Sequence, residues 1–344
     1  MDKFLIIRLS SLGDIIHTLP AYAALRKNFP QAKISWLVED KGKDLLDFVP
    51  GLDRTIVLSS KKWSMASKKF WSEFQRVVRE IRQKDQIALD FQGLIKSGLF
   101  VFLSKAKTRI GFHKKNLRES GASIFYTENL DPISEKMHVI SKNLKLLTRI
   151  GIQKDTFEFP LQIPETLSLS VMEKIKAQGY REGNRLVILN VGAAWETKRW
   201  FTERWIELIR ILNEKNLGVF FLLLWGTDVE RTLAEDIHAK TDTAIAPPLS
   251  LKEVLALVKE ADLLISGDTF ALQVACALSR PVVGLFGPSS PKRNGPFSEQ
   301  DGVAFHEMEC SHCYKRKCSN LECLKKITPQ EVAMLSIQRL EKHD

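Results

Sequence analysis

The sequence predicts an α/β protein built from two doubly wound domains. Short apolar, β-branched runs alternate with helical patterns in both halves of the chain. Continuous apolar strands separated by helices are typical of parallel sheets that are covered on both faces. The length of 344 residues also favours two domains, because domains usually contain about 100–200 residues.

The first domain is predicted to span residues 1–160. Its helices are expected at 21–29 and 68–84, where apolar residues recur at spacings of three and four. The boundary is placed within 157–170, where Pro160 and Pro164 interrupt the pattern. Its predicted strands are the apolar runs 4–9, 34–39, 54–58 and 87–91.

The second domain is predicted to span residues 161–327, and a last helix to occupy 328–344. Thr328 is a suitable N-cap for that helix, and Pro329 suits its first position. The predicted strands of this domain are 186–191, 219–225, 243–247, 263–268 and 281–287. Its predicted helices are 201–216, 228–241, 250–261 and 269–279.

Charge is unevenly distributed along the chain. The formal net charge is +10, but residues 1–160 carry +11 and residues 161–344 carry −1. A concentrated basic region favours an anionic partner, although a lysine-rich solvated helix face is the simpler alternative. The sequence shows no signal peptide, and its longest apolar run, 217–225, is too short to span a membrane. We therefore expect a soluble, cytosolic protein.

The stretch LSSLGD follows the first predicted strand and places Asp14 near the start of a helix. The commonest role of Asp at such a position is an N-cap. A strand–Gly–helix turn also suits an anion or a substrate, for which Asp14 is a candidate general base. The glycine pattern of dinucleotide-binding turns is absent here.

Two further turns in the second half carry candidate ligand-binding residues. NVGAAWETKRW (190–200) combines small residues with Lys198 and Arg199, which suit phosphate oxygens, although an ordinary surface loop is an equal alternative. In WGTDVE (225–230), Glu230 could accept hydrogen bonds from ribose hydroxyls, but an exposed helix-start glutamate is the simpler interpretation.

The segment 266–296 is the best candidate for a diphosphate site. Asp268 and Thr269 end a strand and open a helix, so first-turn amides point towards the space above the strand. The next strand ends in the Gly- and Pro-rich turn GLFGPSSP, which we expect at the same sheet edge. The alternative is a capping role for Asp268 and Thr269.

Four cysteines near the C-terminus allow two interpretations. Their pattern is C-x2-C-x4-C-x4-C, formed by Cys310, Cys313, Cys318 and Cys323. A structural zinc ion would use four such thiolates, although the spacing is shorter than that of the usual zinc ribbon. Reduced, packed thiols explain the pattern equally well, because stable disulfides are rare in the cytosol.

Together these stretches resemble the family 9 glycosyltransferases, the bacterial heptosyltransferases of lipopolysaccharide core synthesis. The resemblance covers nearly the full chain. It is carried by RLSSLGDIIHTLPAYAALRK, DFQGLIKSG (90–98), ISGDTFALQVACAL with PVVGLFGPSSP (265–291), and the late cysteines. DFQGLIKSG and LRESGASIFY (117–126) most resemble members that add the first heptose to the Kdo of lipid A.

The resemblance implies a GT-B fold, with two Rossmann-like domains facing a central cleft and the last helix returning to the first domain. It implies inverting transfer without a metal, from an ADP-heptose on the second domain to an acceptor on the first. Asp14 matches the family's general base. The residues matched to the donor site are Lys198, Glu230, Asp268, Thr269, Phe270 and Gln273.

The acceptor implied by the resemblance is Kdo-lipid A at the inner membrane face of a Gram-negative bacterium, where the enzyme would be peripheral. Its carboxylates and phosphates give the basic first half a role. The candidate acceptor residues are Ser11, Gly13, Lys61, Lys62 and Arg118.

The chain departs from the family's donor motif at two positions. Phe270 stands where the family has Gly, and Gln273 where it has His. The alternative within the family is therefore a different nucleotide-sugar donor or a later core heptose. Two other classes fit less well. A non-catalytic sugar-binding protein needs no carboxylate at Asp14, and a zinc-containing nucleic-acid binder has no recognised motif here, so no nucleic-acid partner is expected.

Overall fold

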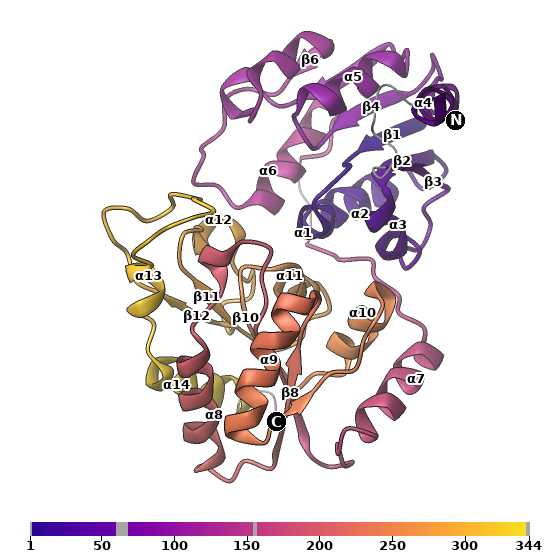
Figure 1. The fold of residues 1–344 in the computed structure, drawn as a ribbon. Helices are drawn as coiled ribbons and strands as arrows, with labels where there is room; N and C mark the ends of the chain where they lie inside the picture. Colours follow the sequence, from indigo (N-terminus) through magenta and orange to yellow (C-terminus); the bar gives the residue numbers. More distant parts are fainter. Residues whose placement is uncertain (1, 60–67, 154–156, 342–344) are drawn as a thin grey trace. The chain divides into compact units, whose positions relative to one another are not determined.

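The structure, a computed structural model, describes residues 2–59, 68–153 and 157–341. The chain divides into two compact units, Met1–Gln162 and Ile163–Asp344. The division lies two residues after the boundary expected at 160. Each unit contains one parallel sheet with helices packed against it (Figure 1).

The first unit is built on a parallel six-stranded sheet. In spatial order its strands are β3 (Arg54–Leu58), β2 (Lys33–Glu39), β1 (Lys3–Ile7), β4 (Ile87–Asp90), β5 (Thr108–Gly111) and β6 (Glu128–Asn129). Its α-helices are α1 (Leu12–Ile16), α2 (Leu19–Asn28), α3 (Asp40–Leu46), α4 (Lys68–Ile81), α5 (Ile95–Leu103) and α6 (Val139–Leu146). Short 3₁₀ helices are η2 (Lys114–Asn116), η3 (Ser120–Phe125) and η4 (Leu147–Ile150).

The second unit repeats this plan. Its parallel six-stranded sheet has the order β12 (Gly302–Phe305), β11 (Val282–Phe286), β10 (Leu263–Gly267), β7 (Arg185–Asn190), β8 (Val219–Leu224) and β9 (Ala244–Ile245). Its longer helices are α7 (Glu165–Lys176), α8 (Thr202–Asn213), α9 (Asp228–Thr241), α10 (Leu251–Lys259), α11 (Phe270–Ala277) and α14 (Pro329–Glu341). The shorter ones are η5 (Glu196–Lys198), α12 (Pro291–Asn294) and α13 (Glu322–Lys325).

The strand order of both sheets reverses direction at one point. In the first unit, β1 pairs with β2 on one side and β4 on the other. In the second, β7 pairs with β8 on one side and β10 on the other. Ligands of open α/β sheets bind beyond the carboxyl ends of the strands at such a reversal. We therefore call the carboxyl ends of β1 and β4 the first switch point, and those of β7 and β10 the second switch point.

The predicted strands and helices lie within or close to observed elements, because each follows an apolar run or a helical repeat. Helix α5 was not predicted, because its sequence IKSGLFVFL is apolar on more than one face and therefore lacks a clear helical period. Short edge strands such as β6, which contains only two residues, were not predicted either. Such strands carry too few residues for an alternating pattern.

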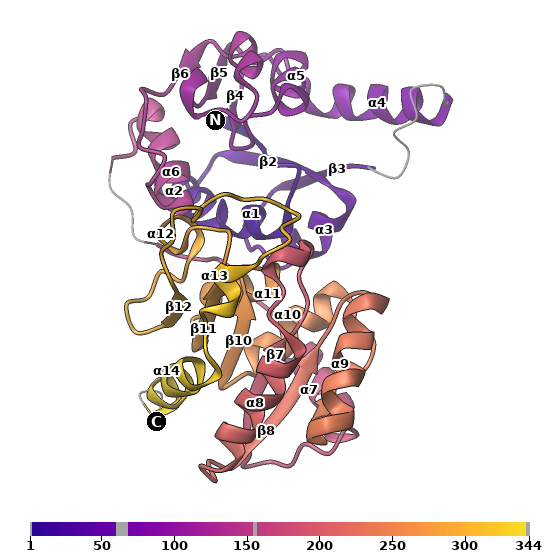
Figure 2. The same ribbon diagram turned by 60° about the vertical axis from the view of Figure 1, so that its left-hand side comes forward.

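The last helix packs on the core of the second unit, and its return to the first domain stays a prediction. Figures 1 and 2 show α14 beside α8. Val332, Ala333 and Leu340 are buried in the hydrophobic core of the second unit, and Arg339 pairs with Asp301 at 2.9 Å. The capping prediction is confirmed, since the Thr328 hydroxyl accepts from the N–H of Glu331 at 3.2 Å. Among the described residues, none of the helices is long and apolar enough to cross a bilayer.

Candidate active site

Asp14 lies in the first turn of α1, at the first switch point. Ser11 is the N-cap residue of this helix, and its backbone N–H and hydroxyl donate to Asp14 Oδ2 at 3.2 and 2.9 Å. Asp14 is therefore the acidic partner of a capping box and not the N-cap itself. The Oδ2 atom of Asp14 accepts both hydrogen bonds from Ser11, whereas its Oδ1 atom contacts a different residue.

The residue that contacts Asp14 Oδ1 is Arg8, which follows β1. Arg8 Nη2 lies 2.8 Å from Asp14 Oδ1, and Arg8 Nη1 donates to the carbonyl oxygen of Phe91. The side chain of Arg8 is 11% exposed and that of Asp14 38%. The carboxylate is therefore the member of this ion pair that faces solvent.

The protonation state of Asp14 is set by opposing effects. Burial raises its pKa, but the charges of Arg8 and His17 and the hydrogen bonds from Ser11 together outweigh burial. The net pKa of Asp14 lies below its ordinary value. Asp14 is consequently a carboxylate at neutral pH, which is the form that accepts a proton.

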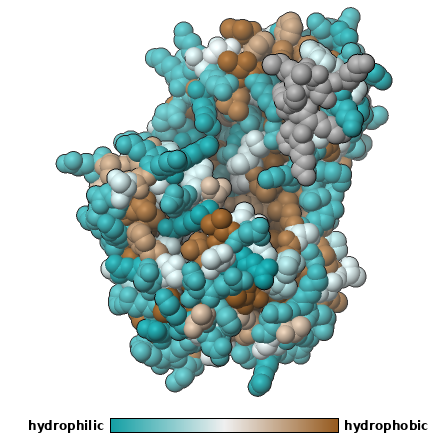
Figure 3. Space-filling model, viewed as in Figure 1, coloured by the Kyte–Doolittle hydropathy of each residue, from teal (hydrophilic) through white to brown (hydrophobic). Residues whose placement is uncertain are grey.

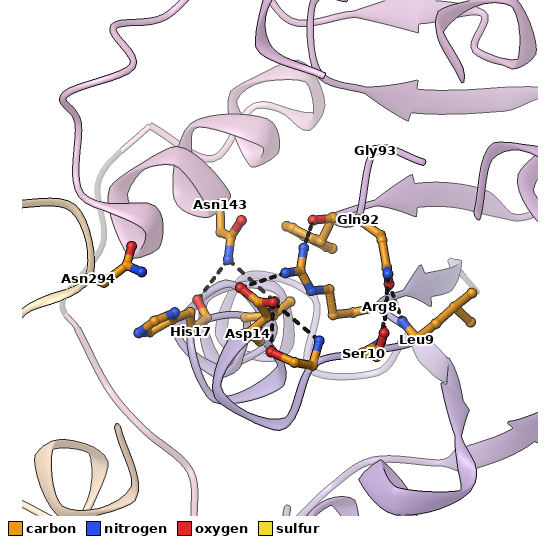
Figure 4. A network of polar contacts seen from close by, with 12 residues as sticks. Arg8, Leu9, Ser10, Asp14, His17, Gln92, Gly93, Asn143 and Asn294 are labelled. Atoms are coloured by element: carbon orange, nitrogen blue, oxygen red, sulfur yellow. Dashed lines mark hydrogen bonds and ion pairs between the residues drawn. The ribbon is translucent and has the colours of Figure 1, made fainter. Parts of the chain in front are cut away.

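A loop after β4 holds the segment that leads to Asp14. Gln92 Oε1 accepts from the backbone N–H groups of Leu9 and Ser10, at 2.6 and 3.2 Å. Figure 4 shows Gln92 reaching Leu9 and Ser10, while Arg8 is directed at Asp14. The two strands of the first switch point are therefore joined beyond their ends by a side chain and not only by the sheet.

Asp90 fixes this loop from inside the unit. It is fully buried and accepts hydrogen bonds from Gln92 N, Gly93 N, Ser97 Oγ and Tyr126 Oη, at 2.8, 3.1, 2.8 and 2.8 Å. Burial raises the pKa of Asp90 in spite of these donors, and burial beside Asp90 also raises the pKa of Tyr126. A buried carboxyl with this many donors rigidifies the turn that carries Gln92.

The predicted acceptor residues of the first unit are only partly brought together. Ser11 is exposed and Gly13 half-buried, and both flank Asp14 in sequence. Arg118 is exposed and follows Leu117, whose side chain lies against Gly93 in the loop after β4. Lys61 and Lys62 lie outside the described residues.

The second switch point contains an ion pair between Lys198 and Asp268. Lys198 Nζ lies 2.6 Å from Asp268 Oδ2 and 3.1 Å from the Asp268 carbonyl oxygen. The Lys198 side chain is 15% exposed and that of Asp268 7%. Gly267 allows this approach, because a Cβ there would lie 2.7 Å from the carbonyl oxygen of Lys198. Here the cation is the more exposed partner.

Thr269 links the two strands of this switch point. It is the N-cap residue of α11, but its side chain makes no cap hydrogen bond to that helix. Its hydroxyl instead lies 2.8 Å from Ser266 Oγ and accepts from Asn190 Nδ2 at 3.0 Å. The capping alternative is therefore wrong for Thr269, because its hydroxyl bonds to residues of β7 and β10 instead of the amides of α11.

Glu230 is buried, contrary to the interpretation as an exposed helix-start residue. It is 8% exposed, and its Oε2 accepts from the N–H of Gly226 at 2.8 Å. Gly192 makes room for it, since a Cβ at Gly192 would lie 2.3 Å from the carboxyl carbon of Glu230. The Glu230 carboxylate thus contacts both the turn that follows β7 and the turn that follows β8.

The two positions that depart from the family motif have different surroundings. Phe270 is half-buried at the first position of α11. Gln273 is buried, and its Nε2 donates to the carbonyl oxygen of Asn294 at 2.8 Å. Asn294 Nδ2 in turn lies 3.5 Å from Asp268 Oδ2. Gln273 therefore contributes to the Lys198–Asp268 pair through Asn294.

Several residues of these sites were not identified as site candidates from the sequence. In the second unit, the ring centroid of Trp195 lies 4.6 Å from Lys198 Nζ and 5.1 Å from Arg316 Cζ. Trp195 thus brings a distant cation next to Lys198. In the first unit, Arg8 and Gln92 lie in stretches that carry the family resemblance, but no role was predicted for them. A charged residue at the end of an apolar strand was the available signal for Arg8.

Cys310, Cys313 and Cys318 lie on the loop before α13, and Cys323 lies within α13. Cys310, Cys313 and Cys318 are exposed and Cys323 is half-buried. Burial raises the pKa of the Cys323 thiol, as do the other three thiols, whereas backbone N–H groups of Leu321 and Asn320 lower the pKa of Cys318. Within the described ranges, no three His, Cys, Asp or Glu side chains are grouped closely enough to hold a metal ion. Zinc at this loop stays a prediction.

Comparison with known proteins identifies the family of this chain and solved structures that share its fold. Residues 74–324 match the family described as Glycosyltransferase family 9 (heptosyltransferase). Lipopolysaccharide heptosyltransferase 1 of Pseudomonas aeruginosa is 26% identical over 92% of this chain and 87% of that protein. Lipopolysaccharide heptosyltransferase 1 of Escherichia coli is 26% identical over 88% of this chain and 92% of that protein.

Two solved structures share the architecture along nearly the whole chain. E. coli heptosyltransferase WaaC with ADP has a TM-score of 0.78 at 21% identity, covering 99% of this chain and 100% of that chain. A family 9 glycosyltransferase from Veillonella parvula has a TM-score of 0.82 at 21% identity, covering 99% and 97%. These likenesses confirm the predicted α/β fold class of GT-B type.

Proposed function

The chain belongs to glycosyltransferase family 9, the heptosyltransferase family, and we propose that it transfers heptose from ADP-L-glycero-D-manno-heptose to the Kdo of lipid A. The relatives named lipopolysaccharide heptosyltransferase 1 support this choice of reaction. The observation that carries the proposal is the ion pair of the first switch point, which presents an ionised Asp14 to solvent and keeps Arg8 behind it.

Asp14 is assigned the role of general base. In an inverting transfer the acceptor hydroxyl attacks the anomeric carbon as the bond from that carbon to the diphosphate oxygen breaks. The hydroxyl proton passes to Asp14, and ADP leaves with the bonding electron pair. Arg8 occupies one side of Asp14 Oδ1 and Ser11 two positions on Oδ2, and a carboxylate has about four such positions. Oδ1 is therefore the atom proposed to accept the hydroxyl.

The first unit is assigned the anionic acceptor. Ser11 and Gly13 flank the base, and Arg118 offers an exposed guanidinium near the loop after β4. A guanidinium binds carboxylates and phosphates in a bidentate manner, which suits Kdo and the lipid A phosphates. Lys61 and Lys62 are proposed for the same role on sequence grounds.

The second unit is assigned the donor. Lys198 and the first-turn amides of α11 would stabilise the charge that develops on the leaving diphosphate, so the transfer is proposed to need no metal ion. Asp268 holds Lys198 in place, and Thr269 ties the helix start to β7. Glu230, beside two glycine turns, is placed to accept from the adenosine ribose.

A different donor or a later heptose acceptor is the second candidate within the family. Phe270 and Gln273 favour it, because they replace the Gly and His of the family motif. Phe270 adds bulk at the first turn of α11, and Gln273 provides a hydrogen bond without a charge. Of these, Phe270 is the residue expected to restrict the sugar, since Gln273 is engaged with Asn294.

We place the enzyme in the cytoplasm, peripheral to the inner membrane, because the proposed acceptor is a lipid. A nucleic acid is not proposed as a partner, since the acceptor's anionic groups account for the basic first half.

A structural zinc ion at Cys310, Cys313, Cys318 and Cys323 is a separate prediction. Metal analysis of protein purified under reducing conditions decides between this ion and packed thiols: one zinc per chain that the double variant Cys310→Ser/Cys313→Ser loses would establish the zinc ion. Wild-type protein that is free of metal yet has reactive, reduced thiols would establish the alternative of packed thiols.

The transfer itself is tested with purified protein, Kdo-lipid A and a panel of ADP-, UDP- and GDP-sugars, with products identified by mass. The proposal expects one heptose to be added from ADP-heptose. Turnover with another donor alone would establish the second candidate. Donor binding without turnover on any acceptor would refute the assignment of an enzyme to this chain.

A further inference from the structure

Helix α5 carries large apolar side chains on its solvent face as well as on its buried face. Ile95, Leu99 and Phe102 follow one another at spacings of four and three, and they are 50%, 37% and 42% exposed. Ile124 on η3, which packs beside α5, is 77% exposed. A surface helix normally turns polar residues to solvent, so four large apolar side chains gathered here indicate an interaction surface. We call Ile95, Leu99, Phe102 and Ile124 the α5 face.

Cations border the α5 face. Lys105 Nζ lies 5.1 Å and Arg109 Cζ 5.8 Å from the ring centroid of Phe102. Lys107, which lies between these two residues in the sequence, is exposed. Helix α5 itself contains no acidic residue, and the carboxylate of the exposed Glu119 accepts from the backbone N–H of Ile95 at 2.8 Å, at the opposite end of the helix from these cations. Figure 3 shows hydrophobic residues with hydrophilic neighbours at the top of the view, over the part of the first unit where Figure 1 labels α5 and β6. Apolar and cationic groups are thus combined on one surface.

The α5 face starts at the first switch point. Helix α5 follows the loop of Gln92, which hydrogen-bonds to the segment before Asp14. Gly121 lies against Ile95, since a Cβ there would be 3.6 Å from Ile95 Cδ1. Whatever binds along α5 therefore has one end near the proposed acceptor residues, including Arg118.

We propose that the α5 face docks this protein on the surface of a bilayer that contains anionic lipids, with Lys105, Lys107 and Arg109 at the level of the phosphates. Apolar side chains that enter the acyl boundary and cations that stay at the headgroups are the usual elements of interfacial binding. A second copy fits less well, because a symmetric contact would set these cations against their own equivalents. The proposal extends the proposed function by naming the surface through which a lipid acceptor is reached.

The test measures partitioning onto sedimented vesicles. Wild-type protein should bind vesicles of phosphatidylcholine mixed with phosphatidylglycerol, and bind phosphatidylcholine alone much more weakly. The variant Leu99→Gln/Ile124→Gln should lower the partition coefficient roughly tenfold or more, because two large side chains no longer enter the apolar layer. The variant Lys105→Glu/Lys107→Glu should lose the preference for phosphatidylglycerol and most of the salt dependence.

A matched control removes equally exposed apolar side chains elsewhere. Leu169 on α7 and Met334 on α14 are 60% and 53% exposed in the second unit, and Leu169→Gln/Met334→Gln should bind vesicles as the wild type does. Equal binding by wild type and Leu99→Gln/Ile124→Gln, or no binding to the mixed vesicles, would overturn the proposal. So would a concentration-dependent dimer that this variant abolishes, since the α5 face would then bind a second copy.

A Kdo acceptor without acyl chains separates docking from transfer. Leu99→Gln/Ile124→Gln should turn over this soluble acceptor as fast as the wild type, since none of its changed residues belongs to the proposed site. If the wild type binds vesicles through the α5 face but transfers no sugar, the proposed function fails and the docking surface stands. A variant that loses vesicle binding and soluble turnover together would show misfolding, which a melting curve identifies.

Discussion

The two units share one topology but present opposite charges at their switch points. In the first unit the exposed member of the ion pair is an anion, Asp14, in front of the more deeply buried Arg8. In the second unit both members are largely buried, and the cation Lys198, 15% exposed, is the less buried of the two beside Asp268, 7% exposed. The strand order therefore determines where polar side chains lie in each unit. The relative burial of the two members of each ion pair determines which ligand charge the site favours.

This difference assigns a chemical task to each unit. An outward carboxylate backed by a guanidinium is ionised and can take a proton from a hydroxyl. An ammonium beside the amino-terminal end of a helix suits a leaving diphosphate.

The largest effect is expected for Asp14→Asn. The amide keeps the size of the side chain but cannot take the proton, so kcat should fall about 10²–10⁴-fold. The matched control is Asp47→Asn, which removes an ion-paired carboxylate of the same unit, 2.9 Å from Lys43. Steady-state turnover that is equal for both variants would exclude Asp14 as the base.

For the second unit, Lys198→Met should raise the donor KM roughly 10–100-fold, because one charge-assisted contact to the diphosphate is lost. The control Lys174→Met removes a lysine that pairs with Glu253 at 2.5 Å, and it should leave the donor KM unchanged. Initial rates at varied donor concentration provide the measurement. A change in the acceptor KM alone would reverse the assignment of the two units.

Tyr126→Phe should lower the free energy of unfolding by about 1.5–3 kcal/mol, because it removes a donor to the fully buried Asp90 carboxylate. Tyr180→Phe, whose hydroxyl donates to the neutral carbonyl of Asn184 at 3.2 Å, should cost only about 1 kcal/mol. Denaturant unfolding measures both. Equal losses would show that the Asp90 network does not hold the loop of Gln92.

The smallest effect is a displaced pH profile in Arg8→Gln. Burial raises the pKa of Asp14, and the guanidinium is the largest of the effects that lower it. Without Arg8 the folded pKa rises, so the acid limb of kcat/KM should move to higher pH, and Arg8→Lys should restore part of the wild-type profile. In the wild type the lowered pKa stabilises the fold above the unfolded pKa of Asp14, and that contribution is lost as pH falls through the folded value. An unmoved acid limb would show that another group limits the rate.

The sequence predicted much of the fold because its central strands are continuous apolar runs. It also predicted that Asp14, Lys198 and Asp268 lie beyond the carboxyl ends of such strands. Their roles in a ligand site stay predictions. Helix α5 was missed because its apolar residues cover both the buried and the solvent face, so no single face stands out. The return of the last helix was inferred from family likeness, whereas its own apolar side chains are part of the core of the second unit.

Partners distant in sequence could not be predicted. The contacts of Gln92 with Leu9 and of Trp195 with Arg316 depend on which strands become neighbours and which loop folds back. Sequence spacing does not contain that information. The same holds for Gln273, whose engagement with Asn294 becomes visible only when α11 and α12 are placed together.

The central claim is that the first switch point takes the proton while the second binds the diphosphate. Calorimetric titration of ADP into wild type, Asp14→Asn and Lys198→Met tests it most directly. The account predicts that Asp14→Asn binds ADP with wild-type affinity although its turnover is lost, and that Lys198→Met binds ADP at least about tenfold more weakly. ADP affinity that falls equally in both variants, or falls only in Asp14→Asn, would contradict it.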